Sequence, residues 1–422
     1  MFRKSVVLSL LCIGVFAFLS PVFSDLQENV RVDLIEIWVK VTDKDNHPVR
    51  GLGPDDFQIY IDNKRMETRC FDQTFGNSTD VSSSIPIQES SAVRSPKRRF
   101  IFFFDMLNSS SSDMNYLKGK ITDFLQTSFT DNDEGMVFVL LPNVHLGVVQ
   151  QMTSSREDLI NVVNKMGGNP NMEIRIRNNE KQLLDLLYGF AVPNRGGNTS
   201  IAVQPDLVRQ ARAVAQGFAK QEENLSRYTL NSFGSIASYL QMDHLDGRLV
   251  MVYVSGGFPL HPGNNYFQII DRALEDSNEF GSNELGFREH PDYDFDKEVR
   301  NMVGHLNRLN VTIYSVDCSG MAEHNNQPDR TTQQLRYGSD TVAYQKELQD
   351  SLVMVSEETG GLVFTNSQNF EKGLAQIATD LGDEYWLCSS VPQGEKAGSY
   401  HKIEVKMARS DLKVRHRKGY VE

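Results

Sequence analysis

The sequence predicts an α/β fold, in which a doubly wound, mostly parallel sheet is inserted between two β segments at the ends of the chain. Between residues 97 and 382, continuous apolar stretches such as Phe100–Phe104 and Arg248–Val254 alternate with helical stretches. This alternation is typical of a parallel sheet that is covered on both faces. At the chain ends the pattern changes to strands in which polar and apolar residues alternate, so that one face is exposed to solvent, as in Tyr400–Met407. Because the strands at each end are too few to be stable alone, we expect them to form one small β-sandwich together.

The N-terminal β segment is expected to cover residues 25–75. Alternation over Val30–Val39 predicts its first strand, and the turn cluster Asp43–Pro48 ends it. A second strand at Phe57–Ile61 leads through the hairpin turn at Asp62 and Asn63 to a return strand. The return strand is expected at Met66–Phe71. The C-terminal segment, residues 383–422, is expected to contain strands at Glu384–Val391, Tyr400–Met407 and Leu412–Tyr420.

A Ser-rich stretch, residues 76–96, is predicted to be a linker into the α/β domain of residues 97–382. Strands of this domain are expected at Phe100–Phe104, Glu134–Leu141, Leu146–Met152, Arg248–Val254, Val311–Val316 and Gly361–Thr365. Helices are expected at Asp113–Ser128, Arg156–Met166, Leu207–Lys220, Tyr228–Leu240, Lys297–Leu309, Tyr344–Thr359 and Phe370–Leu381. The remaining long stretches are expected to be loops, which on a rigid scaffold commonly carry binding function: Gly167–Ser200, Phe258–Asp296 and Ser319–Ser339.

The first 24 residues have the pattern of a signal peptide. Arg3 and Lys4 precede an apolar stretch, and Val22 and Ser24 satisfy the small-residue rule for cleavage before Asp25. The alternative is a membrane anchor, but the apolar stretch is short for a span of roughly 20 residues. We therefore expect an exported protein, periplasmic or extracellular, with no membrane span after cleavage.

Charge and cysteine content narrow the class of partner. Removal of Arg3 and Lys4 takes the net charge from −12 to −14, which disfavours nucleic acid as a partner.

Three cysteines remain after cleavage, and none has metal-site spacing. We expect Cys70 and Cys388, one in each terminal segment, to form a disulfide in an oxidising compartment, and Cys318 to be a buried free thiol.

Polar residues gather where the first strand of the α/β domain ends, at Asp105, Asn108 and Ser109. Ligands of doubly wound sheets bind at this edge, at the carboxyl ends of the strands. An aspartate followed by hydroxyl groups suits a hard cation such as Mg²⁺, which prefers oxygen ligands. The same residues also suit a helix cap, which satisfies free N–H groups of the first turn.

Three groups of motifs in this chain resemble a family of bacterial exported proteins related to the von Willebrand factor A domain. The core carries "F-D-x-L-N-S-S" and a strand that ends in Ser-Gly-Gly, the front carries a "D-F-x-I-x-x-D-N" hairpin, and the tail carries two further patterns. These motifs lie at Phe100–Ser110, Thr229–Phe233, Gly247–Gly257, Asp56–Asn63, His401–Met407 and Val414–Tyr420. The resemblance covers nearly the whole mature chain and implies the von Willebrand factor A fold.

The resemblance also implies a metal-ion-dependent adhesion site, built from Asp-x-Ser-x-Ser, a later Thr and an Asp beside Gly. Asp105 and Ser109 match the first Asp and the second Ser, whereas Leu107 and Ser255 stand where a Ser and the late Asp are required. Thr229 is the candidate for the Thr, with Thr199 as the alternative. Fewer ligands and less charge weaken divalent binding, so the expected Mg²⁺ site is degenerate. Asn108 or Asp317 are the residues that could compensate.

Two functions remain open, because the chain carries no G-x-S-x-G, H-E-x-x-H, P-loop or G-x-G-x-x-G motif of an enzyme. The first is a non-enzymatic adhesion or scaffolding module that binds a protein partner. Its binding face would comprise Asn108, Ser255, Asp317 and the metal residues Asp105, Ser109 and Thr229. The second is a structural subunit of a cell-envelope assembly with no metal-dependent binding.

Overall fold

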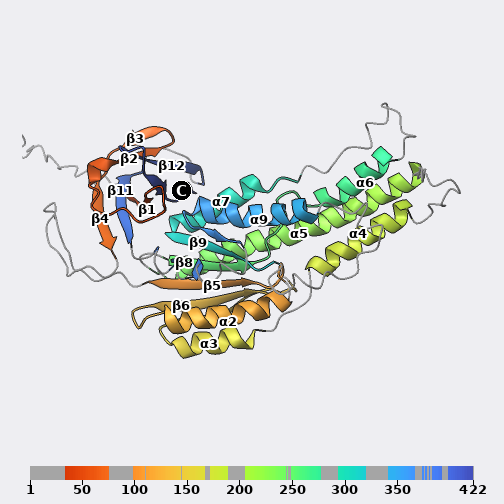
Figure 1. Ribbon diagram of the computed structural model, residues 1–422, viewed down its shortest axis with the longest axis horizontal. Helices are drawn as coiled ribbons and strands as arrows, with labels where there is room; N and C mark the ends of the chain where they lie inside the picture. The colour runs from red at the N-terminus through yellow and green to blue at the C-terminus, as the bar shows by residue number, and fades with distance from the viewer. Residues whose placement is uncertain are drawn as a thin grey trace, which may run out of the picture. The chain divides into compact units, whose positions relative to one another are not determined.

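A computed structural model gives the fold of the chain (Figure 1). It describes residues 34–75, 98–109, 111–143, 145–166, 172–188, 205–243, 245, 249–276, 293–319, 341–365, 373–374, 376–377, 380, 383–391 and 398–421. Residues Ile35–Glu422 belong to one compact unit. The predicted signal peptide, the predicted linker and nearly all of the expected loop Ser319–Ser339 lie outside the described residues.

Six strands form the central sheet, in the order β10-β9-β8-β5-β6-β7. They are β5 Arg99–Asp105, β6 Glu134–Leu140, β7 Leu146–Thr153, β8 Leu249–Ser255, β9 Val311–Asp317 and β10 Val363–Phe364. Neighbouring strands are parallel except β7, which pairs antiparallel with β6. The predicted α/β class with a mainly parallel sheet is therefore confirmed.

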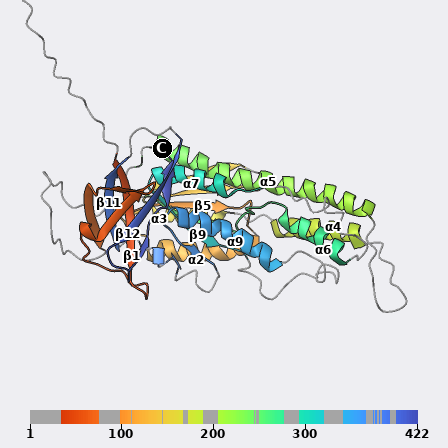
Figure 2. The same cartoon turned by 90° about the horizontal axis from the view of Figure 1, so that it is seen from above.

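Both faces of this sheet are covered, which explains why its inner strands are apolar on both sides. Phe100, Phe102 and Phe104 of β5 pack on one face, and Ile101 and Phe103 pack on the other. Helices α2 and α3 cover the first face, and α5, α7 and α9 cover the second (Figures 1 and 2). Their bounds are α2 Ser111–Thr127, α3 Arg156–Lys165, α5 Pro205–Met242, α7 Asp296–Arg308 and α9 Thr341–Glu358.

The two ends of the chain pair with each other in two four-stranded sheets, ordered β13-β1-β11-β4 and β14-β12-β2-β3. The elements are β1 Leu34–Thr42, the short 3₁₀ helix η1 Pro54–Asp56, β2 Phe57–Ile61, β3 Lys64–Met66, β4 Cys70–Phe75, β11 Asp383–Ser390, β12 Tyr400–Met407, β13 Lys413–Arg415 and β14 Gly419–Val421. β4 pairs antiparallel with β11, and β2 with β12. One hydrophobic cluster joins the sheets, with Ile37 and Tyr385 from one and Ile59 and Ile403 from the other.

A disulfide joins the two ends covalently. Cys70 in β4 and Cys388 in β11 stand opposite each other in the strand register, with their Cα atoms 4.9 Å apart. Cys318, at the end of β9, is free and buried. The predicted pairing and the predicted free thiol are both confirmed.

Two segments expected to be loops contain helices that, with α5, form a helical extension. α4 (Met172–Tyr188) and α6 (Asn264–Asp276) pack against the first half of α5 around a separate apolar core. The loop expectation for Gly167–Ser200 and Phe258–Asp296 was therefore wrong over these parts. In α6, Tyr266, Phe267 and Ile270 recur at helical spacing, a signal that the flanking polar residues outweighed.

α5 is one helix of 38 residues, whereas two separate helices were expected. The polar stretch between them stays helical because Glu222 and Glu223 have partners: Glu222 is buried, and Glu223 pairs with Lys220 and Arg227. α5 ends shortly before β8 begins, so its N-terminal part extends past the carboxyl edge of the sheet (Figure 1). At 1.5 Å per residue, residues 205–228 project about 35 Å beyond that edge.

Two expectations for the terminal strands were also wrong. The return strand expected at Met66–Phe71 is divided into β3 and β4, which belong to different sheets. The tail strand expected at Leu412–Tyr420 is divided in the same way, into β13 and β14. Between β13 and β14, His416 and Arg417 are buried and form bonds outside a strand ladder, so the backbone crosses from one sheet to the other.

Candidate functional site

Asp105 ends β5 and is completely buried at the carboxyl edge of the central sheet. Its Oδ2 accepts three hydrogen bonds: from Asn108 Nδ2 at 2.8 Å, Tyr253 OH at 2.9 Å and Ser255 Oγ at 2.9 Å. Its Oδ1 accepts the backbone N–H of Asn108 at 3.1 Å. All the polar donors to this carboxylate are therefore uncharged groups of the protein.

Asn108 connects this carboxylate to α5. Its Nδ2 also donates to Thr229 Oγ1 at 2.8 Å, and Thr229 Oγ1 in turn donates to the backbone oxygen of Leu225 at 3.3 Å. Thr229 is completely buried and lies inside α5. The sequence had predicted that it lies at the start of a helix. The reason is again that α5 continues without a break from Pro205.

Ser109 and the loop after β8 close the cluster from the outside. Ser109 Oγ donates to the backbone oxygen of Asp105 at 2.5 Å and lies 3.1 Å from Cys318 Sγ. The N–H of Gly256 donates to the backbone oxygen of Asn108 at 3.1 Å. A Cβ at Gly256 would lie 2.4 Å from that oxygen, so this close approach of two loops requires glycine.

Burial dominates the electrostatics of the cluster. It raises the pKa of Asp105 above its ordinary value, although the hydrogen bonds from Asn108, Tyr253 and Ser255 oppose the shift. Burial, and next the nearby charge of Asp105, raise the pKa of Tyr253 well above its ordinary value. Tyr253 therefore stays a neutral donor to Asp105 across the physiological pH range.

The donor set of this cluster does not fit a divalent cation in the arrangement described. Mg²⁺ requires oxygen atoms that point at a common centre, but the lone pairs of Asp105 Oδ2 are taken by three protein donors. An amide N–H group of Asn108 stands between Asp105 and Thr229, where the expected ligand set needs an acceptor. The carboxylate is satisfied in the manner of a helix or turn cap, through the N–H of Asn108, rather than as a metal ligand.

Five of the six residues predicted for the site thus converge in one cluster: Asp105, Asn108, Ser109, Thr229 and Ser255. Asp317 is buried at the neighbouring strand end and bonds instead to Ser319 and Gln349. The alternative threonine, Thr199, lies outside the described residues.

Sequence reasoning missed Tyr253, which donates to the central carboxylate. The signal was available, because a tyrosine inside a fully buried strand needs an acceptor for its hydroxyl group. The sequence also predicted that these residues form a binding face, whereas Asp105, Ser109, Thr229 and Ser255 are all buried.

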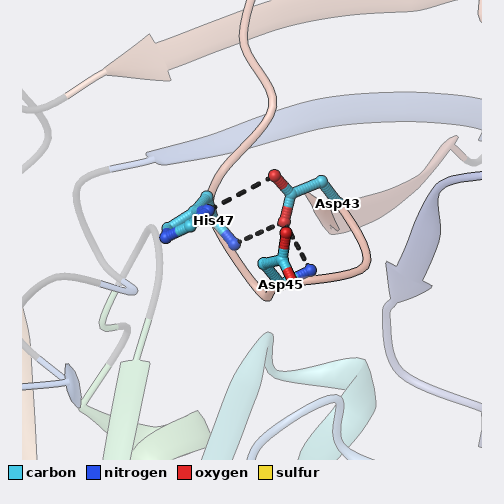
Figure 3. Close-up of side chains that lie close together, drawn as sticks. All are labelled: Asp43, Asp45 and His47. Atoms are coloured by element: carbon cyan, nitrogen blue, oxygen red, sulfur yellow. Dashed lines mark hydrogen bonds and ion pairs between the residues drawn. The ribbon is translucent and has the colours of Figure 1, made fainter.

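Two other groups of acidic and histidine side chains lie close together on the surface. Asp43, Asp45 and His47 form the predicted turn after β1 (Figure 3), where Asp43 Oδ1 accepts the backbone N–H groups of Asp45 and His47, each at 2.9 Å. The bond from the His47 backbone, more than any other cause, holds the pKa of Asp43 below its ordinary value. These bonds give Asp43 a role in the turn itself. The second group is His261, Asp294 and Asp296.

The tail motif has a structural role, because it ties the two chain ends to the α/β domain. Buried His401 lies 2.8 Å from Asp62 of the N-terminal hairpin, through its Nδ1, and stacks on Tyr420. Arg417 donates to the backbone oxygens of Asn307 in α7 and Glu36 in β1. The motif residues that carry the family resemblance in the tail are therefore the ones that join the parts of the fold.

Within the described residues, no helix has the length and apolar character needed to cross a membrane. No family model and no curated protein matches this chain.

Several solved structures are similar to it at a low level of superposition. An aerotolerance-related membrane protein from Bacteroides fragilis is 10% identical, with 67% of this chain and 98% of that chain covered and a TM-score of 0.29. The vWF domain of the type V pili tip protein Mfa5 from Porphyromonas gingivalis is 9% identical, with 67% and 94% covered and a TM-score of 0.30. The pilus adhesin SpaC from Lactobacillus rhamnosus GG is 8% identical, with 90% and 49% covered and a TM-score of 0.30. The solved structures to which the chain is similar thus include a bacterial vWF domain.

Proposed function

We propose that this chain is a non-enzymatic protein-binding module for adhesion or scaffolding, with a degenerate metal-ion-dependent adhesion site that has a structural role. The observation that carries the proposal lies at the carboxyl edge of the sheet. There the Asp105 cluster is buried, while the helical extension rises beyond it. Ligands of doubly wound folds approach this edge, so the extension is the first surface that a partner meets.

The exposed face of α5 carries an uncharged stripe along its length. Its members are exposed and recur every three or four residues, which is the spacing of one helix face. They are Gln210, Ala213, Gly217, Gln221, Asn224, Tyr228, Asn231, Ser235 and Ser238. Amide, hydroxyl and small side chains cost less to desolvate than charges, and Tyr is enriched at protein interfaces. The stripe therefore suits a protein partner better than a cation or a nucleic acid.

Charge placed on this stripe tests the proposal. We would compare the wild type, a Gln221→Glu/Asn224→Glu variant and a matched Gln126→Glu/Asn301→Glu control in cross-linking capture from native envelope extract. Gln126 in α2 and Asn301 in α7 are exposed and lie off the stripe and off β7. We expect the control to capture the same protein as the wild type and the stripe variant to capture at least about tenfold less, a loss of about 1.4 kcal/mol.

The same captures, repeated with Mg²⁺ and with chelator, test the metal. Equal yields in both conditions support a structural role for the Asp105 cluster. Undiminished capture by the stripe variant would contradict the proposed surface, and loss of capture on chelation would contradict the metal-free mechanism.

A structural subunit of an envelope assembly is the second candidate, and the edge strand β7 favours it. Val148 and Val149 of β7 are exposed, and its sequence LGVVQQMT carries no charged residue. Soluble proteins commonly protect an edge strand with charges, so an uncharged edge invites pairing with another chain. Light scattering after gel filtration distinguishes the candidates: a fixed oligomer that Val149→Lys dissociates would favour the structural role.

Export and the domain arrangement are part of the proposal. The disulfide between Cys70 and Cys388 supports an oxidising compartment, periplasmic or extracellular.

We infer that residues 25–75 and 383–422 form one β-sandwich and that the doubly wound domain of residues 97–382 is inserted between them. The shared cluster of Ile37, Ile59, Tyr385 and Ile403 supports this arrangement. Limited proteolysis tests it, because two separately folded terminal fragments would contradict a single sandwich.

A further inference from the structure

A small cavity lies where the terminal strands meet the α/β domain. Lys40, Arg415 and Arg417 line it from the terminal strands, together with Glu384, and Asn310 and Thr359 line it from the α/β domain. Its free volume of about 20 Å³ is that of one water-sized ligand.

Two guanidinium nitrogens of arginines that line this cavity have no hydrogen-bond partner among the described residues: Arg415 Nη1 and Arg417 Nε. Both atoms are buried, and Arg417 as a whole is only 7% exposed. The other nitrogens of Arg417 donate to the backbone oxygens of Asn307 and Glu36, which carry no full charge. A buried donor without an acceptor costs free energy, and more so when it is charged.

The charged groups at the cavity are unevenly paired. Lys40, Arg415 and Arg417 lie near the carboxylates of Asp380, Glu384 and Glu36. Lys40 lies 2.9 Å from Glu384 and 3.4 Å from Asp380, and Arg415 also pairs with Asp380.

Among the described residues, Arg417 forms hydrogen bonds to backbone oxygens and no ion pair with a carboxylate. Glu36 is the nearest source of negative charge, and its carboxylate already accepts a bond from Asn310 Nδ2 at 2.9 Å. Burial outweighs the attraction of Glu36 and lowers the pKa of Arg417 to about 10. The charge of Arg417 is thus satisfied by backbone oxygens and only partly by Glu36.

We propose that this cavity binds a small monovalent anion of chloride size, held between Arg415 Nη1 and Arg417 Nε. Arg415 and Arg417 both line the cavity, so their side chains reach the same space. The buried His416 between them points away and accepts the N–H of Val405. An anion accepts both unpartnered N–H groups and carries a charge opposite to that of the arginines, whereas a water molecule carries none.

The position of the cavity gives the anion a role in holding the fold together. Arg417 donates hydrogen bonds both to α7 and to β1. Asp380 pairs with Arg415 and Lys40, and its carboxylate also accepts a hydrogen bond from the hydroxyl group of Tyr314 in β9 at 3.2 Å. An anion beside these arginines therefore stabilises the contact of the α/β domain with the terminal strands. This inference is independent of the proposed binding surface on α5.

Chloride itself is the probe for the test. Unfolding of the full chain would be followed in sodium chloride and in sodium gluconate at equal ionic strength, because gluconate is too large for the cavity. The folding equilibrium constant should rise by the factor 1 + [Cl⁻]/Kd, which is about tenfold at nine times Kd. Line broadening of ³⁵Cl resonances reports binding directly.

The matched variants are Arg415→Gln and Arg409→Gln. Arg409 is exposed and pairs with Asp411, so its loss changes the net charge equally without touching the cavity. We expect Arg415→Gln to reduce the chloride effect to less than about twofold, and Arg409→Gln to keep it. Equal stability of the wild type in chloride and gluconate would overturn the proposal, as would ³⁵Cl broadening that persists unchanged in Arg415→Gln.

Discussion

Two buried polar regions of the molecule differ in how their charges are satisfied. One is the Asp105 cluster, and the other is the Lys40 junction, where Lys40, Glu384, Asp380, Arg415 and Arg417 join the terminal strands to the α/β domain. Asp105 is surrounded by neutral donors, of which Tyr253, Ser255 and Asn108 contribute side-chain groups. At the junction, Lys40 is paired with carboxylates, and Arg417 is left with backbone oxygens. A carboxylate that accepts hydrogen bonds from neutral donors needs no further partner, whereas a group of paired charges is sensitive to the addition or loss of one charge. The comparison indicates that the Asp105 cluster is structural and that the Lys40 junction can bind a ligand.

The largest effect is expected at the junction. Lys40→Met removes the cation that lies 2.9 Å from Glu384, which is 2% exposed, and breaking a buried ion pair on one side costs about 3–5 kcal/mol. Urea unfolding at pH 7 measures the loss. As a control, Lys406→Met removes an exposed lysine of a surface pair and should cost less than about 0.5 kcal/mol. A loss below about 1 kcal/mol for Lys40→Met would show that the junction does not rely on its charges.

The next effect is the response of the junction to pH. Burial lowers the pKa of His416 from 6.5 to about 4. Between these values the unfolded chain binds a proton that the folded chain does not, so stability falls as the pH is lowered through this window. The full shift corresponds to about 3 kcal/mol. Unfolding measured from pH 7.5 to 4 should show this slope, and His416→Gln should flatten it; an equal slope in both proteins would refute the assignment.

A smaller effect is expected in the Asp105 cluster. Tyr253→Phe removes one of three donors to Asp105 Oδ2 and leaves the other two in place. The expected loss is about 1 kcal/mol, the net contribution of one hydrogen bond. Chemical unfolding of the variant beside the wild type measures it, and a loss as large as that of Lys40→Met would remove the distinction between the two regions.

The smallest effect is the one expected from Mg²⁺. A cation present at 100 times its Kd stabilises a protein by about 2.7 kcal/mol, which would raise the melting temperature by several degrees. Because the lone pairs of Asp105 Oδ2 are already engaged, we expect 10 mM MgCl₂ to leave the melting temperature unchanged relative to 10 mM CaCl₂ and to chelator at matched ionic strength. A rise specific to Mg²⁺ that Asp105→Asn abolishes would show that the cluster rearranges to bind metal.

The sequence by itself determined the strands of the central sheet, the α/β class and the residues that meet at its carboxyl edge. These follow from local patterns: Phe100–Phe104 is apolar at every position because both faces are covered, and the end of a parallel strand places Asp105 at the edge. The disulfide between Cys70 and Cys388 was also predicted from the sequence, since each terminal segment contributes one cysteine and the expected export would supply the oxidant.

Only the tertiary structure decided what those residues do. Whether Asp105 holds a cation or accepts neutral donors depends on Tyr253 and on the amide of Asn108, and hydrogen bonds between distant residues leave no periodic trace in a sequence. The continuity of α5 likewise depends on partners for Glu222, such as Tyr266 of α6. The surroundings of Arg417 arise because segments from both chain ends and from the α/β domain meet there, and a charge count along the chain does not record which charges become neighbours.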